Sequence, residues 1–158
     1  MSGRHTADYP AGRTDLPLTP SPPATDLDLT LTDLSELGPL RAAVRSWLHQ
    51  QAVATAAIDD VVVAVTEVAA NGLVHGAAPV RVYAWRHVRT LVVQVDDAGG
   101  RPLPAAAGHL PPDPGEASGR GLWLARQLAD VVTTHTGGGT TSVRLQFPHD
   151  VTHRGPAQ

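Results

Sequence analysis

The sequence contains no cysteine and no lysine, few aromatic residues and no long hydrophobic run. Without cysteine, the chain can form neither disulfides nor thiolate metal sites. All 12 basic residues are arginines, which excludes the phosphate-loop motifs that need lysine and leaves Arg as the only side-chain cation for a phosphate. No apolar stretch could span a bilayer, and the first residues lack the charged-then-apolar pattern of a secretory signal. We therefore expect a cytoplasmic protein with no membrane contact.

The length and composition fit one globular domain. A chain of 158 residues can bury a core, and its 42% hydrophobic and 17% charged residues lie in the globular range. Its net charge of −3 argues against direct nucleic-acid binding through a basic surface. Five prolines within the first 23 residues, among few large apolar groups, are typical of a disordered tail. We predict disordered tails over residues 1–24 and 149–158, and a folded domain over 25–148.

The hydrophobic pattern predicts the secondary structure of the first half. Alternating leucines in "DLDLTLTD" indicate a strand with one buried face, and the spacing of Asp33 and Glu36 predicts a turn of helix after it. A helix is expected over about residues 38–50. A second helix is expected from a cap at Thr55 to a stop at Gly76. The residues of the first helix expected to face inward are Leu40, Val44, Trp47 and Leu48.

The second half predicts hairpins around one more helix. "VRVYAW" and "TLVVQVD" read as two strands joined by "RHVR", and "VVTTHT" and "TSVRLQF" read as two more around "GGGT". Between the hairpins, residues 101–118 form a long loop, and "GRGLWLARQLADVV" predicts an amphipathic helix. This order predicts an α+β, two-layer sandwich: a mixed, mostly antiparallel sheet with helices on one face.

Three polar residues recur every fourth position in the helical stretch "EVAANGLVHG". At 3.6 residues per turn, Glu67, Asn71 and His75 share one side of the helix, while the other sides are apolar. A solvated helix face is the simplest interpretation. However, such faces usually carry Lys, Arg or several Glu, and small neighbours leave room here for a ligand. Asn can bind a hard cation, and Glu can act as a base.

Two glycine-rich turns carry further candidate residues. Asp97 ends a strand whose Val93 and Val95 point to the same side, so it is the polar end of a buried row. A carboxylate there can accept a hydrogen bond from an exocyclic amine such as that of adenine. The alternative is an Asp that only begins a turn.

The second glycine-rich turn precedes the last helix. Gly119 and Gly121 flank Arg120, and backbone amides at a glycine-rich helix start bind anions. The Arg120 guanidinium can make paired contacts with a phosphate. The alternative is a flexible helix N-terminus without a ligand.

These motifs, in this order, resemble the GHKL ATPase superfamily. Glu67-x-x-x-Asn71 resembles its N box, Asp97-x-Gly99 its G1 box, and Gly119-Arg120-Gly121-Leu122 its G2 box. "AVTEVAANGLVHG" and "GRGLWLARQLADVV" are most similar to bacterial anti-sigma-factor serine kinases, especially the small regulatory ATPases of actinobacteria. The resemblance covers about residues 27–147. It implies a Bergerat fold that holds ATP and Mg²⁺ between helices and a lid over about residues 101–118.

The resemblance also implies a role for each matched residue. Asn71 would coordinate Mg²⁺, Glu67 would activate or orient the attacking hydroxyl, and Asp97 would bind the adenine amine while Gly99 lets the base approach. The G2 residues would hold the phosphates. His75 would cap the helix or touch phosphate. A family threonine near the adenine is matched by Thr140 or Thr141.

The implied function is an ATP-dependent protein-serine kinase that sequesters a sigma factor and phosphorylates a serine of an anti-anti-sigma (STAS-type) protein. One departure favours an alternative. The G1 box usually reads D-x-G-x-G, and here Arg101 occupies the second glycine position. Starting the box at Asp96 restores Gly100 but replaces the first glycine by Ala98. The alternative is therefore a partner-switching module of the same fold without catalysis, with or without bound nucleotide. Relatives often dimerise through the first strand and helix, so a homodimer is left open.

Overall fold

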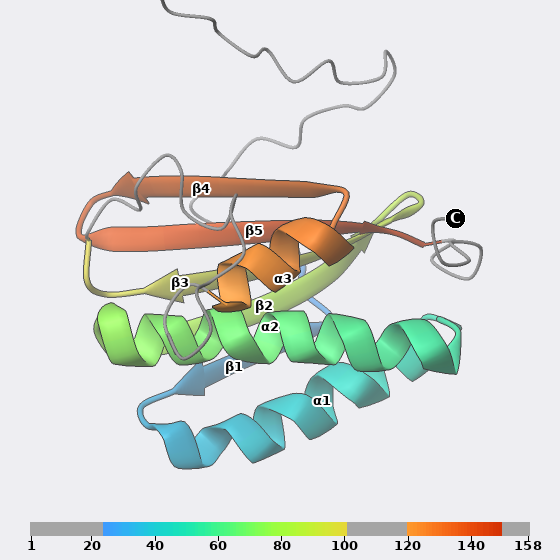
Figure 1. The fold of residues 1–158 in the computed structure, drawn as a ribbon, viewed down its shortest axis with the longest axis horizontal. Coiled ribbons are helices and arrows are strands. Elements are labelled where there is room, and N and C mark those ends of the chain that lie inside the picture. The colour runs from blue at the N-terminus through green and yellow to red at the C-terminus, as the bar shows by residue number, and fades with distance from the viewer. Residues whose placement is uncertain (1–23, 101–119, 150–158) are drawn as a thin grey trace, which may run out of the picture.

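Five strands form one antiparallel sheet in the computed structural model, which describes residues 24–100 and 120–149. The sheet order is β1-β2-β3-β5-β4, so a long crossover places β5 between β3 and the edge strand β4 (Figure 1). All four strand pairs of the described residues are antiparallel. The strands are β1 (Leu27–Leu31), β2 (Val80–His87), β3 (Thr90–Asp97), β4 (Val131–Gly137) and β5 (Thr140–Pro148).

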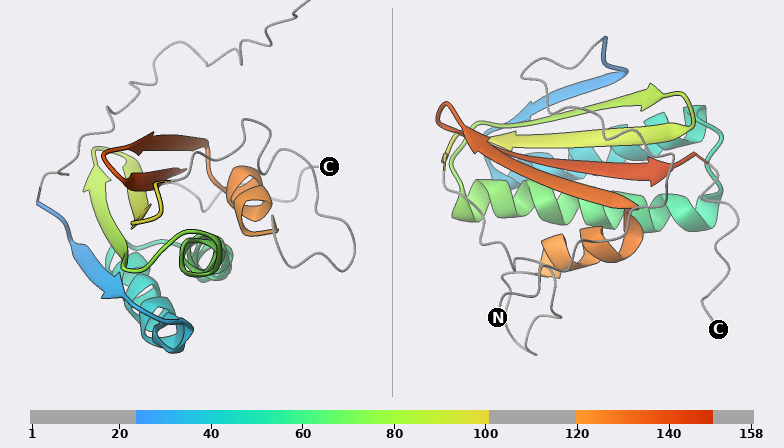
Figure 2. Two further views of the ribbon diagram at one scale, coloured as in Figure 1. Left: turned by 90° about the vertical axis from the view of Figure 1, so that its left-hand side faces the viewer. Right: turned by 90° about the horizontal axis from the view of Figure 1, so that it is seen from above.

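The helices cover one face of this sheet (Figure 2). They are the short 3-10 helix η1 (Leu34–Glu36), then α1 (Leu37–Gln50), α2 (Thr55–His75) and α3 (Arg120–Leu128). The central helix α2 packs against both α1 and α3 and against β2 and β3. The predicted α+β architecture with helices on one face is confirmed. Within the described ranges, no helix is long and apolar enough to cross a membrane.

The core lies between the two layers. The predicted inward residues of α1 are all buried, and Leu37 joins them. From the sheet, Val82 and Ala84 of β2 and Val93 and Val95 of β3 are buried in the same cluster. The alternation expected from the sequence therefore holds along the central strands.

The start of α2 differs from the prediction. Thr55 is the first helical residue, and the N-cap is Ala54, which has extended backbone angles and no side-chain cap. A residue already inside the helix cannot place its hydroxyl on the free amides of the first turn. Asp59 lies near this end, as expected, and forms a 2.6 Å ion pair with Arg45 of α1.

Two other boundaries are shorter than predicted. The β2–β3 turn consists only of Val88 and Arg89, since His87 and Thr90 already pair. Val88 has a φ of 54° and is 75% exposed. The last helix ends at Leu128, because the Asp130 amide already donates 2.8 Å to the Gln146 carbonyl of the sheet.

Several predictions fall on residues outside the described ranges. They concern the predicted loop over 101–118, Gly119, and the predicted tails apart from their inner ends at Ala24 and His149. These stay predictions.

Candidate functional site

Asp97 ends β3 on the side of the sheet that the helices cover. Val93 and Val95, two and four residues earlier, are buried in the core between the layers. Because side chains alternate along a strand, Asp97 shares their side and Asp96 takes the other. On that other side, Asp96 accepts hydrogen bonds from the Tyr83 hydroxyl and, at 2.9 Å, from the Gln94 amide. The inward register expected for Asp97 is therefore observed.

The carboxylate of Asp97 rests on the last turn of α2. A Cβ added to Gly76 would lie 2.5 Å from Cγ and Oδ1 of Asp97 and 2.7 Å from Oδ2. A Cβ added to Gly72 would lie 3.4 Å from Cβ of Asp97 and 3.1 Å from the Val80 side chain. Only glycine at position 76 leaves room for this carboxylate. The two glycines therefore let the strand end approach the helix closely enough for one site to include both.

The turn after Asp97 closes around its carboxylate. The Gly99 amide donates 2.8 Å to Oδ1 of Asp97, and the Ala98 amide donates 2.9 Å to the Ala77 carbonyl just beyond α2. A Cβ on Gly99 would lie 2.9 Å from the same Oδ1 and 3.1 Å from the Gly76 Cα. Gly99 therefore allows the close approach of this turn to the helix end, and it leaves Oδ2 to accept from a ligand.

The register of β5 separates the two candidate threonines. Thr141 pairs directly with Asp97 across the sheet, and its side chain is 3% exposed. Thr140 pairs with Gly137 of β4 at the start of the strand. Paired residues share a face and neighbours in sequence do not. Thr141 is therefore the threonine that belongs beside Asp97, and Thr140 lies on the opposite face.

The predicted polar stripe runs along α2 toward this turn. Glu67 and Asn71 are half-buried, and His75 is exposed at the last position of the helix. Asn71 and His75 each immediately precede one of the glycines that contact Asp97. One residue along an α-helix is a rotation of about 100°, so their side chains point to one side of that contact. Successive members of the stripe are about 6 Å apart along the helix axis. Asn71 and His75 therefore lie at the Asp97 turn, and Glu67 lies one turn further along α2.

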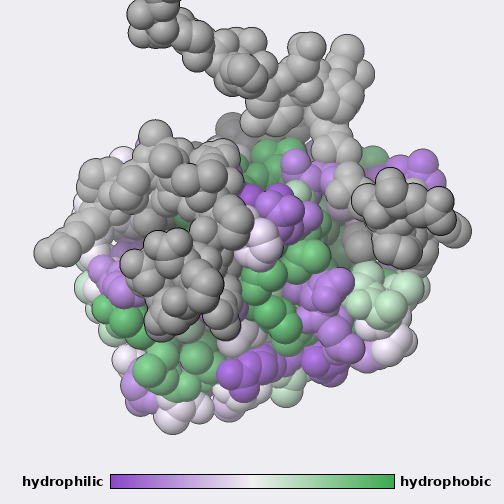
Figure 3. All heavy atoms as spheres, in the orientation of Figure 1, coloured by the Kyte–Doolittle hydropathy of each residue, from purple (hydrophilic) through white to green (hydrophobic). Residues whose placement is uncertain are grey.

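Part of α2 is open to solvent beside the stripe. Val63 is 47% exposed and Val74 is 59% exposed. Green hydrophobic areas lie among purple hydrophilic ones on this face in Figure 3. Glu67 is on the same side of the helix as Val63.

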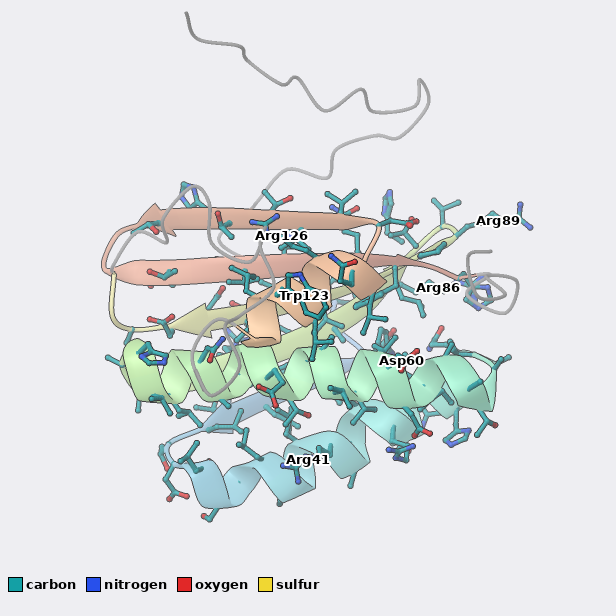
Figure 4. All side chains as sticks on the ribbon, viewed as in Figure 1. Arg41, Asp60, Arg86, Arg89, Trp123 and Arg126 are labelled. Carbon is teal, nitrogen blue, oxygen red and sulfur yellow. The ribbon has the colours of Figure 1, made fainter. Side chains whose placement is uncertain are left out.

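The third motif opens α3, which packs on α2. Arg120 and Gly121 are its first two residues, and Leu122 is buried in the core. The Leu122 side chain therefore anchors the helix in the core, and its contact with a nucleotide stays a prediction. Figure 4 shows Trp123 and Arg126 on the same helix, and Arg86 and Arg89 at the end of the sheet far from the Asp97 turn.

Sequence reasoning missed a polar network on the sheet face away from the helices. Arg144 of β5 donates to Oε1 of Gln94 through Nε at 2.9 Å and Nη2 at 2.5 Å, and its guanidinium lies 5.1 Å from the Trp85 ring centroid. Burial raises the pKa of Asp96, and a Ser142 hydrogen bond and nearby arginines oppose that rise. The alternation in "VRVYAW" and "TSVRLQF" marks these residues as outward-facing, but their pairing depends on strand order.

The donor set at this site fits an adenine nucleotide with magnesium. Oδ2 of Asp97, which has no hydrogen-bond donor among the residues that the structure describes, can accept from an exocyclic amine. Magnesium keeps several waters and binds through one or two protein oxygens plus phosphates, so the single amide oxygen of Asn71 is a sufficient protein ligand. Among the described residues, no three His, Asp or Glu side chains gather as a metal site.

Comparisons with known proteins give two findings. The family model of the histidine kinase-like ATPase domain matches residues 30–147. The fold is similar to a crystal structure of the RsbU and RsbW domains of Rv1364c from Mycobacterium tuberculosis, with a TM-score of 0.56 and 22% sequence identity. That match covers 77% of this chain but only 32% of that one. A search of curated proteins gives no match.

Proposed function

Because this chain belongs to the histidine kinase-like ATPase family, we propose that it binds ATP where the end of α2 meets the Asp97 turn. The observation that carries this proposal is the packing around the Asp97 carboxylate. Its carboxylate is held by the Gly99 amide, with Gly72 and Gly76 beneath it and Thr141 opposite. A buried strand end that positions one acceptor beside glycines suits a flat base with an amino group.

The phosphate end of the nucleotide extends along α2 from this point. Asn71 would supply an amide oxygen to magnesium, which would neutralise charge on the phosphates, and His75 lies at the helix end one turn beyond Asn71. Gly119, Arg120 and Gly121 contribute backbone amides and one cation to the phosphates, as the resemblance implies. Glu67, one turn beyond Asn71, accepts the proton of an attacking hydroxyl.

We further propose that the hydroxyl belongs to a serine of an anti-anti-sigma protein of the STAS type. The serine oxygen attacks the terminal phosphorus of ATP, ADP leaves, and Glu67 takes the serine proton. The chain also sequesters a sigma factor, and the two partners compete for it. The similarity of the fold to the RsbW-containing structure supports a partner-switching role, and the exposed side of α2 beside Glu67 provides access for a protein substrate.

The second candidate function is a partner-switching module without phosphotransfer. The observation that favours it is Arg101, which replaces the second glycine of the G1 box. In that case the nucleotide site is weakened or unused, and the exposed helix side serves only to hold a partner.

Two substitutions on α2 separate these functions. Asn71→Ala removes the proposed magnesium ligand and is expected to abolish Mg²⁺-ATP binding in calorimetry. Glu67→Ala is expected to retain that binding but to lose phosphate transfer from radiolabelled ATP to candidate anti-anti-sigma proteins of the same genome. Glu67→Gln is the matched control for shape, since it keeps the size of the side chain and removes the base.

The outcomes are distinct. If the wild-type protein binds no ATP, the kinase proposal fails and the nucleotide-free module stands. If it binds ATP and Glu67→Ala transfers phosphate at the wild-type rate, Glu67 is not the base. Val63→Ala, at an exposed position one turn before Glu67, should leave ATP binding unchanged and so controls for general damage to α2.

A further inference from the structure

A buried polar network spans three strands on the sheet face away from the helices. Arg144 of β5 is 1% exposed and donates to Gln94 of β3. Gln94 donates 2.9 Å to Oδ1 of Asp96, and the Tyr83 hydroxyl of β2 donates to Oδ2. Each oxygen of Asp96 therefore has its own donor, Gln94 from β3 and Tyr83 from β2, and Ser142 of β5 also makes a side-chain hydrogen bond to this carboxylate. Arg81, 4.4 Å from the Tyr83 ring centroid, extends this network to Asp28 of β1.

Placing these charged groups away from water costs free energy. Burial raises the pKa of the Asp96 carboxyl and lowers that of the Arg144 guanidinium, so both groups lose hydration. Buried charged groups of this kind are tolerated when they are fully hydrogen-bonded, and such networks rigidify their surroundings. The network ends at Asp96, one residue from the proposed adenine acceptor.

On the opposite side of β3, Asp97 is oriented by close backbone packing and by one hydrogen bond. Gly72 and Gly76 pack beneath its carboxylate with backbone alone, and among the residues that the structure describes the hydrogen-bond donor to this carboxylate is the Gly99 amide. Asp96 and Asp97 share a peptide unit and point to opposite faces. The direction of the Asp97 side chain is therefore fixed largely by how the backbone at Asp96 is held.

We propose that Tyr83 and Gln94 are positioning residues for Asp97: by holding both oxygens of Asp96 on the outer face, they aim the Asp97 carboxylate at the nucleotide base on the inner face. The ligand in this inference rests on the proposed ATP-binding function. The positioning itself is a property of the free protein and can be measured without a nucleotide.

The first experiment measures the Asp97 turn in the free full-length protein. Tyr83→Phe removes only the hydroxyl and keeps the buried ring. The Gly99 amide, which donates to Oδ1 of Asp97, is expected to exchange with solvent about tenfold faster in this variant, relative to the Val65 amide in the middle of α2. A purely structural role would accelerate both amides together. An unchanged ratio of the two rates would overturn the proposal.

Two further variants keep this test decisive. Gln146→Leu removes an amide from the same face of β5, away from Asp96, and is expected to leave the Gly99 to Val65 ratio unchanged. Asp96→Asn keeps the side-chain size but replaces one acceptor oxygen by a donor, so it should raise the ratio as Tyr83→Phe does. If Tyr83→Phe does not fold, the Asp96→Asn result decides between support and rejection.

The second experiment uses the nucleotide. Purine riboside triphosphate lacks the 6-amino group of ATP, so the ratio of the two affinities reports the Asp97 contact alone. Tyr83→Phe is expected to reduce the preference for ATP about three- to tenfold while leaving the affinity for the amine-free analogue within twofold. An unchanged preference would contradict the proposal. If the wild-type protein binds neither nucleotide, the proposed function fails, and the Gly99 exchange ratio alone supports or overturns the positioning role.

Discussion

The close contact between the Asp97 carboxylate and Gly76 makes Gly76→Ala the most direct single test of the proposed nucleotide site. The added methyl would lie 2.5 Å from Cγ and Oδ1 of Asp97 and 2.7 Å from Oδ2, well inside contact distance. The overlap is therefore with the end of a side chain and not with backbone. The fold should survive, and the carboxylate should be displaced from its position.

The size of the effect follows from the contact that is lost. A hydrogen bond to a charged group contributes about 1.5–3 kcal/mol. Its loss raises the dissociation constant for ATP about 10- to 150-fold, at about 1.4 kcal/mol per factor of ten.

The assay is isothermal titration with Mg²⁺-ATP, together with urea unfolding of the same samples. Gly38→Ala in α1 is the matched control, since a Cβ there would meet nothing within 4 Å. It should leave ATP affinity unchanged and slightly raise stability. The reasoning is refuted if Gly76→Ala binds ATP as tightly as the wild-type protein does.

Two further predictions concern stability. Val88→Gly should raise the free energy of unfolding in urea by about 0.5–1 kcal/mol. The φ of 54° is strained for an exposed, β-branched residue, and glycine relieves that strain at some entropic cost. A lower urea midpoint would contradict this. Since burial raises the pKa of Asp96 above 3.8, the folded state holds that proton more tightly than the unfolded state does, and wild-type stability should fall relative to Asp96→Asn as the pH rises from about 4 to 7. A pH-independent difference in urea unfolding between the two proteins would show that the carboxyl titrates alike in both states.

The sequence predicted the order of the elements because each has a strong local pattern. The alternation of Val93, Val95 and Asp97 identified which of two adjacent aspartates faces the helices, and the fourth-residue stripe placed Asn71 at the same end of the molecule. These inferences needed only the periods of strand and helix. The family resemblance added chemical roles to those positions, which the proposed experiments address.

Other features could not be predicted because they depend on contacts between distant segments. Arg144 joins the network of Tyr83, Gln94 and Asp96 only because β5 pairs with β3, which no local period shows. The close contact between Gly76 and Asp97 depends on the final angle between helix and sheet. The cap expected at Thr55 was wrong because a hydroxyl residue near a predicted start can lie on either side of the true boundary.

The last turn of α2 also sets a fixed length between two ends of the proposed ligand. In the proposed function, Asn71 lies toward the phosphates and Gly76 packs against the acceptor for the base, so one segment holds both recognition points. Inserting or deleting one residue between them would rotate one relative to the other by about 100° and shift it by about 1.5 Å. This segment should therefore accept changes of side chain at its exposed positions far more readily than any change in length.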